Sequence, residues 1–213
     1  PAATEETALV AMGGLDRRER LRERAPDPLV ELRHQPETGV LVITLNDPTH
    51  SNAIDWAIAA DLQQAISAAK VMGDAVRAVV LQGRGDHFCV GVNPYSFIRR
   101  TKDLPVLTAA RVTYEIYRAF VGIRDLGVPV VCALHGKVMG GGLAAMLNAD
   151  YRIAAQSTVF NYGNLPRGVC PGMLLSENLE RVIGARWAMD LYLQDYTLTA
   201  TQAREIGLIH ELA

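Results

Sequence analysis

The segment at residues 127–150 places the strongest constraint on the fold, because it joins a strand pattern to a helix pattern through glycine. β-Branched apolar residues open the segment and lead through His135 to three consecutive glycines at residues 140–142. A helical pattern of small residues follows at residues 143–147. The segment therefore predicts a strand, a turn and a helix whose first N–H groups are open to a bound group.

These glycines have a chemical consequence. Where no Cβ atom stands in the way, the unpaired N–H groups at the positive end of a helix can approach a ligand, which suits a developing oxyanion. A tight strand-to-helix crossing packed against another element would explain the same three glycines. A second turn, HFCVGVNPYSF at residues 87–97, favours the chemical interpretation. There Gly91 admits a conformation closed to other residues, and the N–H group of Val92 follows where the chain leaves the sheet.

Length and composition set further bounds. The 213 residues, of which 49% are hydrophobic and 21% charged, are expected to form one soluble globular domain. A net charge of −2 argues against binding nucleic acid or an anionic membrane through bulk electrostatics. No apolar run approaches the roughly 20 residues of a membrane span, and the N-terminus does not resemble a signal peptide. We therefore expect a cytoplasmic protein without a cofactor or a metal.

The three cysteines, Cys89, Cys132 and Cys170, cannot all pair with one another. They lie in apolar or Gly/Pro-rich surroundings and show no C-x-x-C spacing. We expect all three to be reduced, buried and inert.

The order of the patterns predicts an α/β protein. Residues 1–28 are interpreted as a linker or N-terminal arm, and residues 29–213 as the folded domain. Residues 29–34 and 40–45 predict a hairpin, followed by a helix at about residues 54–72 that Ser51 or Asn52 caps and a buried strand at residues 79–81. Strand, helix and strand in this order suggest parallel pairing. Further helices are expected at residues 108–126, 175–183 and 185–193.

Five motifs occur in the order found in one family. They are DPTHSNAI, FCVGVN, HGKVMGGGLAAMLNADYRIA, a loop ending in GVCPG, and LTATQAREIGLIHEL. Residues 29–212 thereby resemble the crotonase superfamily, also called the enoyl-CoA hydratase/isomerase family. The resemblance implies a crotonase-like ββα spiral with helices packed around it, here lacking the usual C-terminal helices. It also implies a homotrimer or trimer-based assembly and an acyl thioester substrate on CoA or an acyl carrier protein.

The resemblance assigns an oxyanion hole to the N–H groups of Val92 and Gly141, beside Gly91 and Gly140. Hydratases of the family carry two glutamates at the positions of Ala144 and Asn164. Neither residue here can act as a general base, so hydration by two carboxylates, or isomerisation by the loop carboxylate, is not expected.

In lacking both glutamates, the chain resembles polyketide β-branching decarboxylases, which act on a methylglutaconyl group carried by an acyl carrier protein. By this resemblance Arg100 holds the leaving carboxylate, and an enolate in the oxyanion hole takes the electrons. Alternatively, Arg100 is a solvated helix charge. Two other functions stay open, namely an enoyl-CoA hydratase/dehydratase or isomerase of the same family, and a non-catalytic docking module in a multidomain synthase.

Five other side chains are candidates for the site. Tyr95 could donate a hydrogen bond into the pocket or only cap its wall, and Asn164 could orient the substrate. His135 is a candidate substrate contact, or else a buried histidine that holds a structural hydrogen bond. Tyr162 and Arg167 lie with Asn164 on an irregular loop that we expect to face the site.

Overall fold

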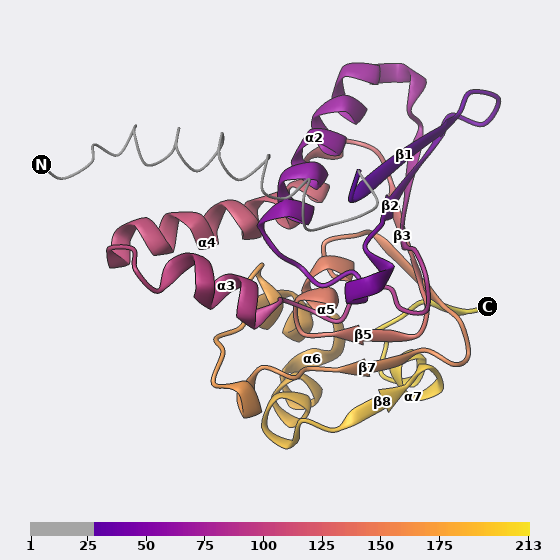
Figure 1. Cartoon of the computed structure of the whole chain (residues 1–213). Helices are drawn as coiled ribbons and strands as arrows, with labels where there is room; N and C mark the ends of the chain where they lie inside the picture. The colour runs from indigo at the N-terminus through magenta and orange to yellow at the C-terminus, as the bar shows by residue number, and fades with distance from the viewer. Residues whose placement is uncertain (1–27) are drawn as a thin grey trace, which may run out of the picture.

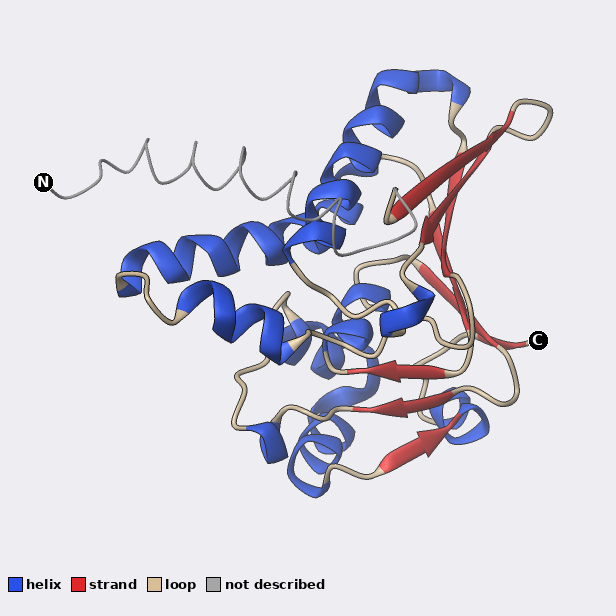
Figure 2. Cartoon of the chain, viewed as in Figure 1, coloured by secondary structure: helices blue, strands red, loops and turns tan. Residues whose placement is uncertain are grey.

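The computed structural model describes residues 28–213 of the chain, and two sheets form its framework (Figure 1). One sheet has six strands in the order β1-β2-β3-β4-β6-β9, and the other has three in the order β5-β7-β8. Helices cover one side of the larger sheet, and the smaller sheet lies at one end of the molecule (Figure 2). This mixed α/β architecture confirms the predicted crotonase-like fold. The predicted arm at residues 1–28, apart from Pro28, lies outside the described residues and stays a prediction.

The larger sheet begins with the predicted hairpin, because β1 and β2 pair antiparallel. All later pairs, from β2–β3 to β6–β9, are parallel, as the strand-helix-strand order predicted. In the smaller sheet β5 and β7 are parallel, whereas β7 and β8 are antiparallel. The strands of the larger sheet are β1 (Val30–Gln35), β2 (Val40–Leu45), β3 (Ala78–Gly83), β4 (Val130–Leu134), β6 (Tyr151–Ala154) and β9 (Glu211–Leu212). Those of the smaller sheet are β5 (Lys137–Met139), β7 (Val159–Asn161) and β8 (Thr197–Thr199).

The helices agree closely with the sequence pattern. The predicted helix at residues 108–126 is α4 followed by a 3-10 turn, and Gly184, with φ of 81°, separates the two helical stretches predicted after residue 175. The helices are α2 (Trp56–Met72), α3 (Pro94–Thr101), α4 (Val106–Val121), α5 (Gly141–Met146), α6 (Leu175–Gln194) and α7 (Ala200–Glu205). The 3-10 turns are η1 (Pro48–His50), η2 (Gly73–Ala75), η3 (Gly122–Leu126) and η4 (Leu165–Arg167).

The predicted cap of α2 was wrong. Asp55 caps the helix, because its carboxylate accepts hydrogen bonds from the N–H groups of Ala57 and Ile58 at 2.9 and 3.1 Å. Ser51 and Asn52 instead form a tight left-handed turn, each with φ of 55°. Asn52 is buried there, and its side chain braces the turn, so it is not available to a helix that starts later.

The core lies between the larger sheet and helices α2 and α4. Leu41 and Ile43 of β2 and Ile58 and Leu62 of α2 are at most 1% exposed. Each such side chain contributes roughly 1.5–3 kcal/mol through burial.

Since β3 and β4 are neighbouring parallel strands, the segments that follow them leave the same edge of the sheet. The segment after β4 forms β5, which leads into the glycines at residues 140–142, and its Val138 forms a parallel bridge with Cys89. This brings the two predicted glycine turns together.

Candidate active site

Three segments meet beyond the edge of the sheet, and backbone hydrogen bonds hold them together. Ile54 forms an isolated parallel bridge with Val92, and Cys89 forms another with Val138. The bond from Met139 N–H to the Cys89 carbonyl, at 3.1 Å, belongs to the second bridge. The segment that contains Gly91 therefore lies between Ile54 on one side and the approach to the three glycines on the other.

The Val92 N–H group points away from Ile54. The Ile54 N–H group donates to the carbonyl of Gly91 at 2.7 Å, and in a trans peptide the next N–H group faces the opposite way. Gly91 has φ of 93°, and a Cβ atom there would lie 2.8 Å from the Met139 carbonyl oxygen and 3.2 Å from Gly141 N. Only glycine permits both this backbone conformation and this close approach.

The Gly141 N–H group lies at the start of α5. The carbonyl of Gly140 accepts a helical hydrogen bond from Ala144 N at 3.1 Å, so the N–H group of the same peptide points out of the helix. A Cβ atom at Gly141 would lie 3.3 Å from a methyl group of Val92. No hydrogen bond from Val92 N–H or Gly141 N–H to another described residue is present. Two adjacent donors are thus available to one bound oxygen atom.

The third glycine of the run has a different role. A Cβ atom at Gly142 would lie within 2.2 Å of the Cys89 carbonyl oxygen, which no real structure tolerates. Gly142 is therefore required by packing between α5 and the Cys89 segment. The chemical interpretation of the glycine run therefore applies to Gly141, and the packing interpretation applies to Gly142.

Asn164 lies beside these donors. Its side chain is 9% exposed, and its Oδ1 atom is 3.5 Å from the position that a Cβ atom on Gly140 would take. Its Nδ2 atom donates a long hydrogen bond of 3.4 Å to the Cys170 carbonyl, whereas Oδ1 is buried without a partner among the described residues. This oxygen can therefore accept a hydrogen bond from a bound molecule.

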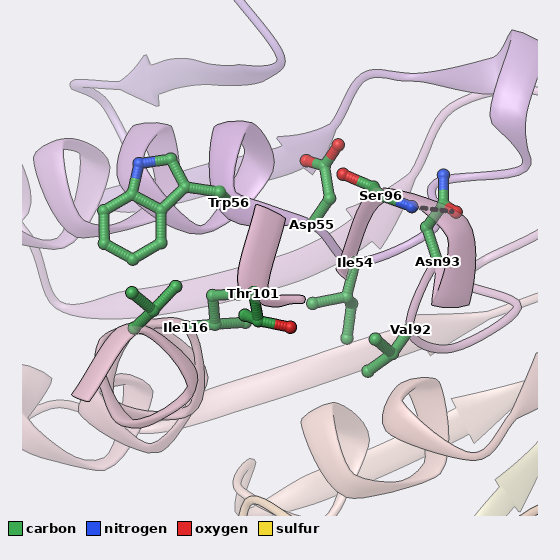
Figure 3. Close-up of a pocket in the computed structure, with 9 residues that line it drawn as sticks. Ile54, Asp55, Trp56, Val92, Asn93, Ser96, Thr101 and Ile116 are labelled. Carbon is green, nitrogen blue, oxygen red and sulfur yellow. Dashed lines mark hydrogen bonds between the residues drawn. The ribbon is translucent and has the colours of Figure 1, made fainter. Parts of the chain in front are cut away.

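A pocket adjoins Val92 on the side of α3 and α4. Its exposed surface is almost entirely apolar. Figure 3 shows Ile54 and Val92 close together, whereas the carboxylate of Asp55 points away from them. The lining residues are Ile54, Asp55, Trp56, Val92, Asn93, Ser96, Thr101, Val112 and Ile116. The free volume of the pocket is only about 10 Å³, the size of one water molecule, so it marks an apolar contact beside the two N–H donors and does not hold an acyl chain as it stands.

Comparison with known proteins gives the family. The sequence profile of the enoyl-CoA hydratase/isomerase family matches residues 35–213. The chain belongs to this family. A Mycobacterium tuberculosis protein named as an enoyl-CoA hydratase is 32% identical over 191 residues, which cover 87% of this chain and 66% of that protein. A Thermus thermophilus protein of the same description is 31% identical over 180 residues, covering 84% and 70% of the two chains.

The crystal structure of an enoyl-CoA hydratase/isomerase from Mycobacterium abscessus superposes with a TM-score of 0.76 at 36% identity. The match covers 86% of this chain and 70% of that one. The chain spans about two thirds of the length of the curated relatives it matches, with values of 68%, 66% and 60%. Among the helices in residues 28–213, none is long and apolar enough to cross a membrane. Over the same residues, no group of three or more His, Cys, Asp or Glu side chains could hold a metal ion.

Asn93 follows the first glycine turn and caps helix α3. Its Oδ1 atom accepts a hydrogen bond from Ser96 N at 3.1 Å (Figure 3), the geometry of a helix cap, and Pro94 follows as the first residue of α3. The Asn-Pro pair therefore starts a helix. Tyr95 and Arg100 belong to α3 by their backbone, but their side chains lie outside the described residues. Their predicted roles stay predictions.

The other predicted contacts of this enoyl-CoA hydratase/isomerase member have structural partners. His135 Nε2 lies 2.9 Å from the Gly85 carbonyl oxygen, so this ring supports the turn after β3. Tyr162 packs edge-on against Tyr192, with ring centroids 5.0 Å apart. Burial is the main cause that raises the pKa of Tyr162 to about 12, and the neighbouring Tyr192 is the second cause. It is the backbone carbonyl oxygen of Tyr162, and not its ring, that approaches Gly140, at 3.4 Å from the position of a Cβ atom there.

Arg167 is exposed, and its Nη1 atom donates to the Gly163 carbonyl at 2.5 Å. The guanidinium therefore closes the turn that holds Asn164. Within the predicted loop, Asn164 is the side chain that the structure brings to the glycine turns.

The apolar residues of the pocket have no distinctive sequence pattern. Val112 and Ile116 lie four residues apart on the buried face of α4, so their spacing in the sequence is that of ordinary core positions of a helix. Ile54 lies directly after the Asn52 turn, where a helix was expected to begin. The bridge between Ile54 and Val92 that makes it a site residue depends on a long-range contact.

One cysteine corrects the sequence analysis. Cys89 and Cys132 are fully buried, and burial raises the pKa of each thiol from 9.0 to about 12. Cys170 is exposed, because it lies on the irregular loop after η4. Gly and Pro neighbours mark a loop and do not indicate whether that loop is covered.

Proposed function

We propose that the chain binds the carbonyl oxygen of an acyl thioester between the N–H groups of Val92 and Gly141 and stabilises the enolate formed there. One observation carries the proposal: two donors without described acceptors adjoin each other beside a glycine-lined gap. Removal of a comparable donor in other enzymes costs about 3 kcal/mol in the transition state. CoA or a carrier protein would supply the thioester.

The first candidate reaction is hydration or isomerisation of an enoyl thioester. The names of the relatives support it. Positions 144 and 164 hold alanine and asparagine, and neither can take a proton near neutral pH. This candidate therefore requires another group to transfer the proton.

The second candidate is decarboxylation of a 3-methylglutaconyl-type thioester, which the same two residues favour. When CO2 leaves, the electron pair of the broken C–C bond moves into the thioester, whose carbonyl oxygen becomes the enolate oxygen, so the step begins without a base. A proton from water then completes the product. We propose that Arg100 binds the carboxylate and that Tyr95 donates a hydrogen bond. Asn164, with its unpartnered buried Oδ1 atom, would orient the substrate in either reaction.

The experiment incubates the full chain with crotonyl and 3-methylglutaconyl thioesters, each on CoA and on an acyl carrier protein, and follows their masses. A gain of water, or a double-bond shift detected in the ultraviolet spectrum, supports the first candidate. Loss of CO2 supports the second. If no thioester binds or reacts, the proposal of a thioester site fails.

The assembly is a separate part of the proposal. A homotrimer or a trimer-based assembly follows from the family resemblance of the sequence. Sedimentation equilibrium of the full chain tests it, and a monomer at high protein concentration would contradict it.

A further inference from the structure

Helices α3 and α4 form a hairpin, residues 94–121, that projects from the body of the molecule (Figure 1). Its inner side belongs to the candidate active site, because Ser96, Thr101, Val112 and Ile116 line the pocket. The hairpin thus forms one wall of the site, and its other side faces outward.

The outward side combines apolar and basic side chains. Leu107, Arg111, Tyr114 and Arg118 follow one another at steps of four, three and four residues, which places them on one face of α4. Leu107 and Tyr114 are 63% and 62% exposed, and both arginines are exposed as well. Exposed apolar side chains of the same hairpin also include Ile98 and Val106.

The hairpin has the opposite charge to the rest of the chain. Residues 94–121 contain five Lys or Arg and two Asp or Glu, a net charge of +3. The whole chain has a net charge of −2, so the other residues carry −5. An acidic partner is therefore favoured at this hairpin over the rest of the chain.

We propose that the outer face of the hairpin docks a small acidic carrier protein that bears the acyl thioester. The inference rests on the proposed function, because it names the form in which the substrate arrives. Exposed apolar side chains interleaved with arginines suit the side of an acidic amphipathic helix. A carrier bound there contacts the same two helices that line the pocket, so docking and delivery of the acyl group take place at one wall.

The test measures binding of the full chain to an acyl carrier protein without an acyl group, by fluorescence anisotropy, and binding of crotonyl-CoA separately. Arg111→Glu should raise the Kd for the carrier protein about tenfold, and the interaction should weaken with salt. Leu107→Ser and Tyr114→Ala, which leave the charge unchanged, should weaken it in the same direction. Crotonyl-CoA binding should stay within about twofold of that of the unmodified chain in all three variants.

The matched control is Arg204→Glu, which reverses an exposed arginine on α7. It should leave carrier binding unchanged. An equal loss in this control, or no loss in the hairpin variants, overturns the docking proposal. Binding to phosphatidylglycerol vesicles but not to the carrier protein would also overturn it, in favour of a membrane surface.

The two proposals fail in different ways. If crotonyl-CoA does not bind but the carrier protein docks on the hairpin, the docking inference stands and the thioester site fails. If crotonyl-CoA binds and the carrier protein does not, the thioester site stands and the docking inference fails.

Discussion

The two walls of the candidate site are built in different ways. The glycine wall, formed by the turns at Gly91 and at residues 140–142, offers backbone N–H groups and has no room for a side chain at Gly91 or Gly142. The hairpin wall, residues 94–121, offers side chains from α3 and α4 and is open to solvent on its far side. The first wall can stabilise an oxyanion whatever group is attached to the carbonyl. The second can discriminate among such groups and among their carriers.

This difference predicts how the walls respond to substitution. In the glycine wall, an added methyl group at Gly91 or Gly142 meets backbone atoms, which cannot move without displacing a strand or helix, whereas at Gly141 it meets the ends of side chains. In the hairpin wall, a changed side chain alters affinity or specificity and leaves the framework in place. The largest effects on the protein are therefore expected in the glycine wall, and smaller ones in the hairpin wall.

Gly142→Ala should destabilise the fold by about 3 kcal/mol, because its Cβ atom would overlap the Cys89 carbonyl oxygen. Urea unfolding followed by circular dichroism measures the change. Gly122→Ala is the control, since φ there is −61° and the nearest atom is 3.7 Å away. The control should stay within about 1 kcal/mol of the unmodified chain. Equal stability of both variants would contradict the assigned packing role of Gly142.

Gly141→Val should abolish function with a smaller loss of stability than Gly142→Ala. Its Cβ atom would meet the ends of the Ile54 and Met173 side chains at 3.0 Å, and such ends can shift. The added methyl groups would fill the space beside the two N–H donors and lower turnover of any accepted thioester by at least about 100-fold. If thioester binding is indifferent to Gly141→Val, the non-catalytic docking module becomes the better account.

Arg100→Ala tests the hairpin wall in the decarboxylation candidate. Loss of a charged hydrogen bond to the substrate carboxylate should lower turnover of 3-methylglutaconyl thioester roughly 30- to 1000-fold, with product binding nearly unchanged. Arg100→Lys should restore part of the activity, because it retains the charge. Arg99→Ala is the neighbouring control, and a larger effect there would move the carboxylate contact from Arg100 to Arg99.

Asn164→Ala should lower turnover about tenfold, the effect of one lost neutral hydrogen bond to the substrate. The Oδ1 atom is buried and has no partner among the described residues, so its removal should cost little stability. A large loss of stability with unchanged turnover would assign Asn164 to the support of its loop. Asn161→Ala is the comparison, because the Asn161 Nδ2 atom donates hydrogen bonds to the carbonyl oxygens of Asp195 and Tyr196 at 3.0 and 3.3 Å.

Thiol labelling compares the buried residues Cys89 and Cys132 with the exposed loop after η4, without a substitution. At pH 8, Cys170 should react rapidly with a disulfide reagent, whereas Cys89 and Cys132 should react only after denaturation. Since the pKa values of Cys89 and Cys132 rise from 9.0 to about 12 on folding, the folded state retains protons that the unfolded state loses. Stability should therefore fall as the pH rises from about 9 to 12. Rapid labelling of all three thiols in the native protein would contradict the burial.

Much of the framework could be predicted because it depends on local rules. The alternating pattern in residues 29–45 specifies a hairpin, and a glycine at the start of a helix specifies an N–H group without an intrahelical acceptor. The pairing of Val92 with Gly141 rested on the family resemblance. The parallel neighbours β3 and β4, together with the bridge between Cys89 and Val138 of β5, now explain it physically, because they bring both turns to one place.

The side chains around those turns required the tertiary structure. Asp55 and not Asn52 caps α2, and Asn93 starts α3, because the backbone fold decides which polar side chain reaches which N–H group. The separate duties of Gly141 and Gly142 depend on whether Val92 or Cys89 lies opposite. A sequence pattern records the local conformation of each segment, whereas packing and access to solvent depend on residues that are distant along the chain.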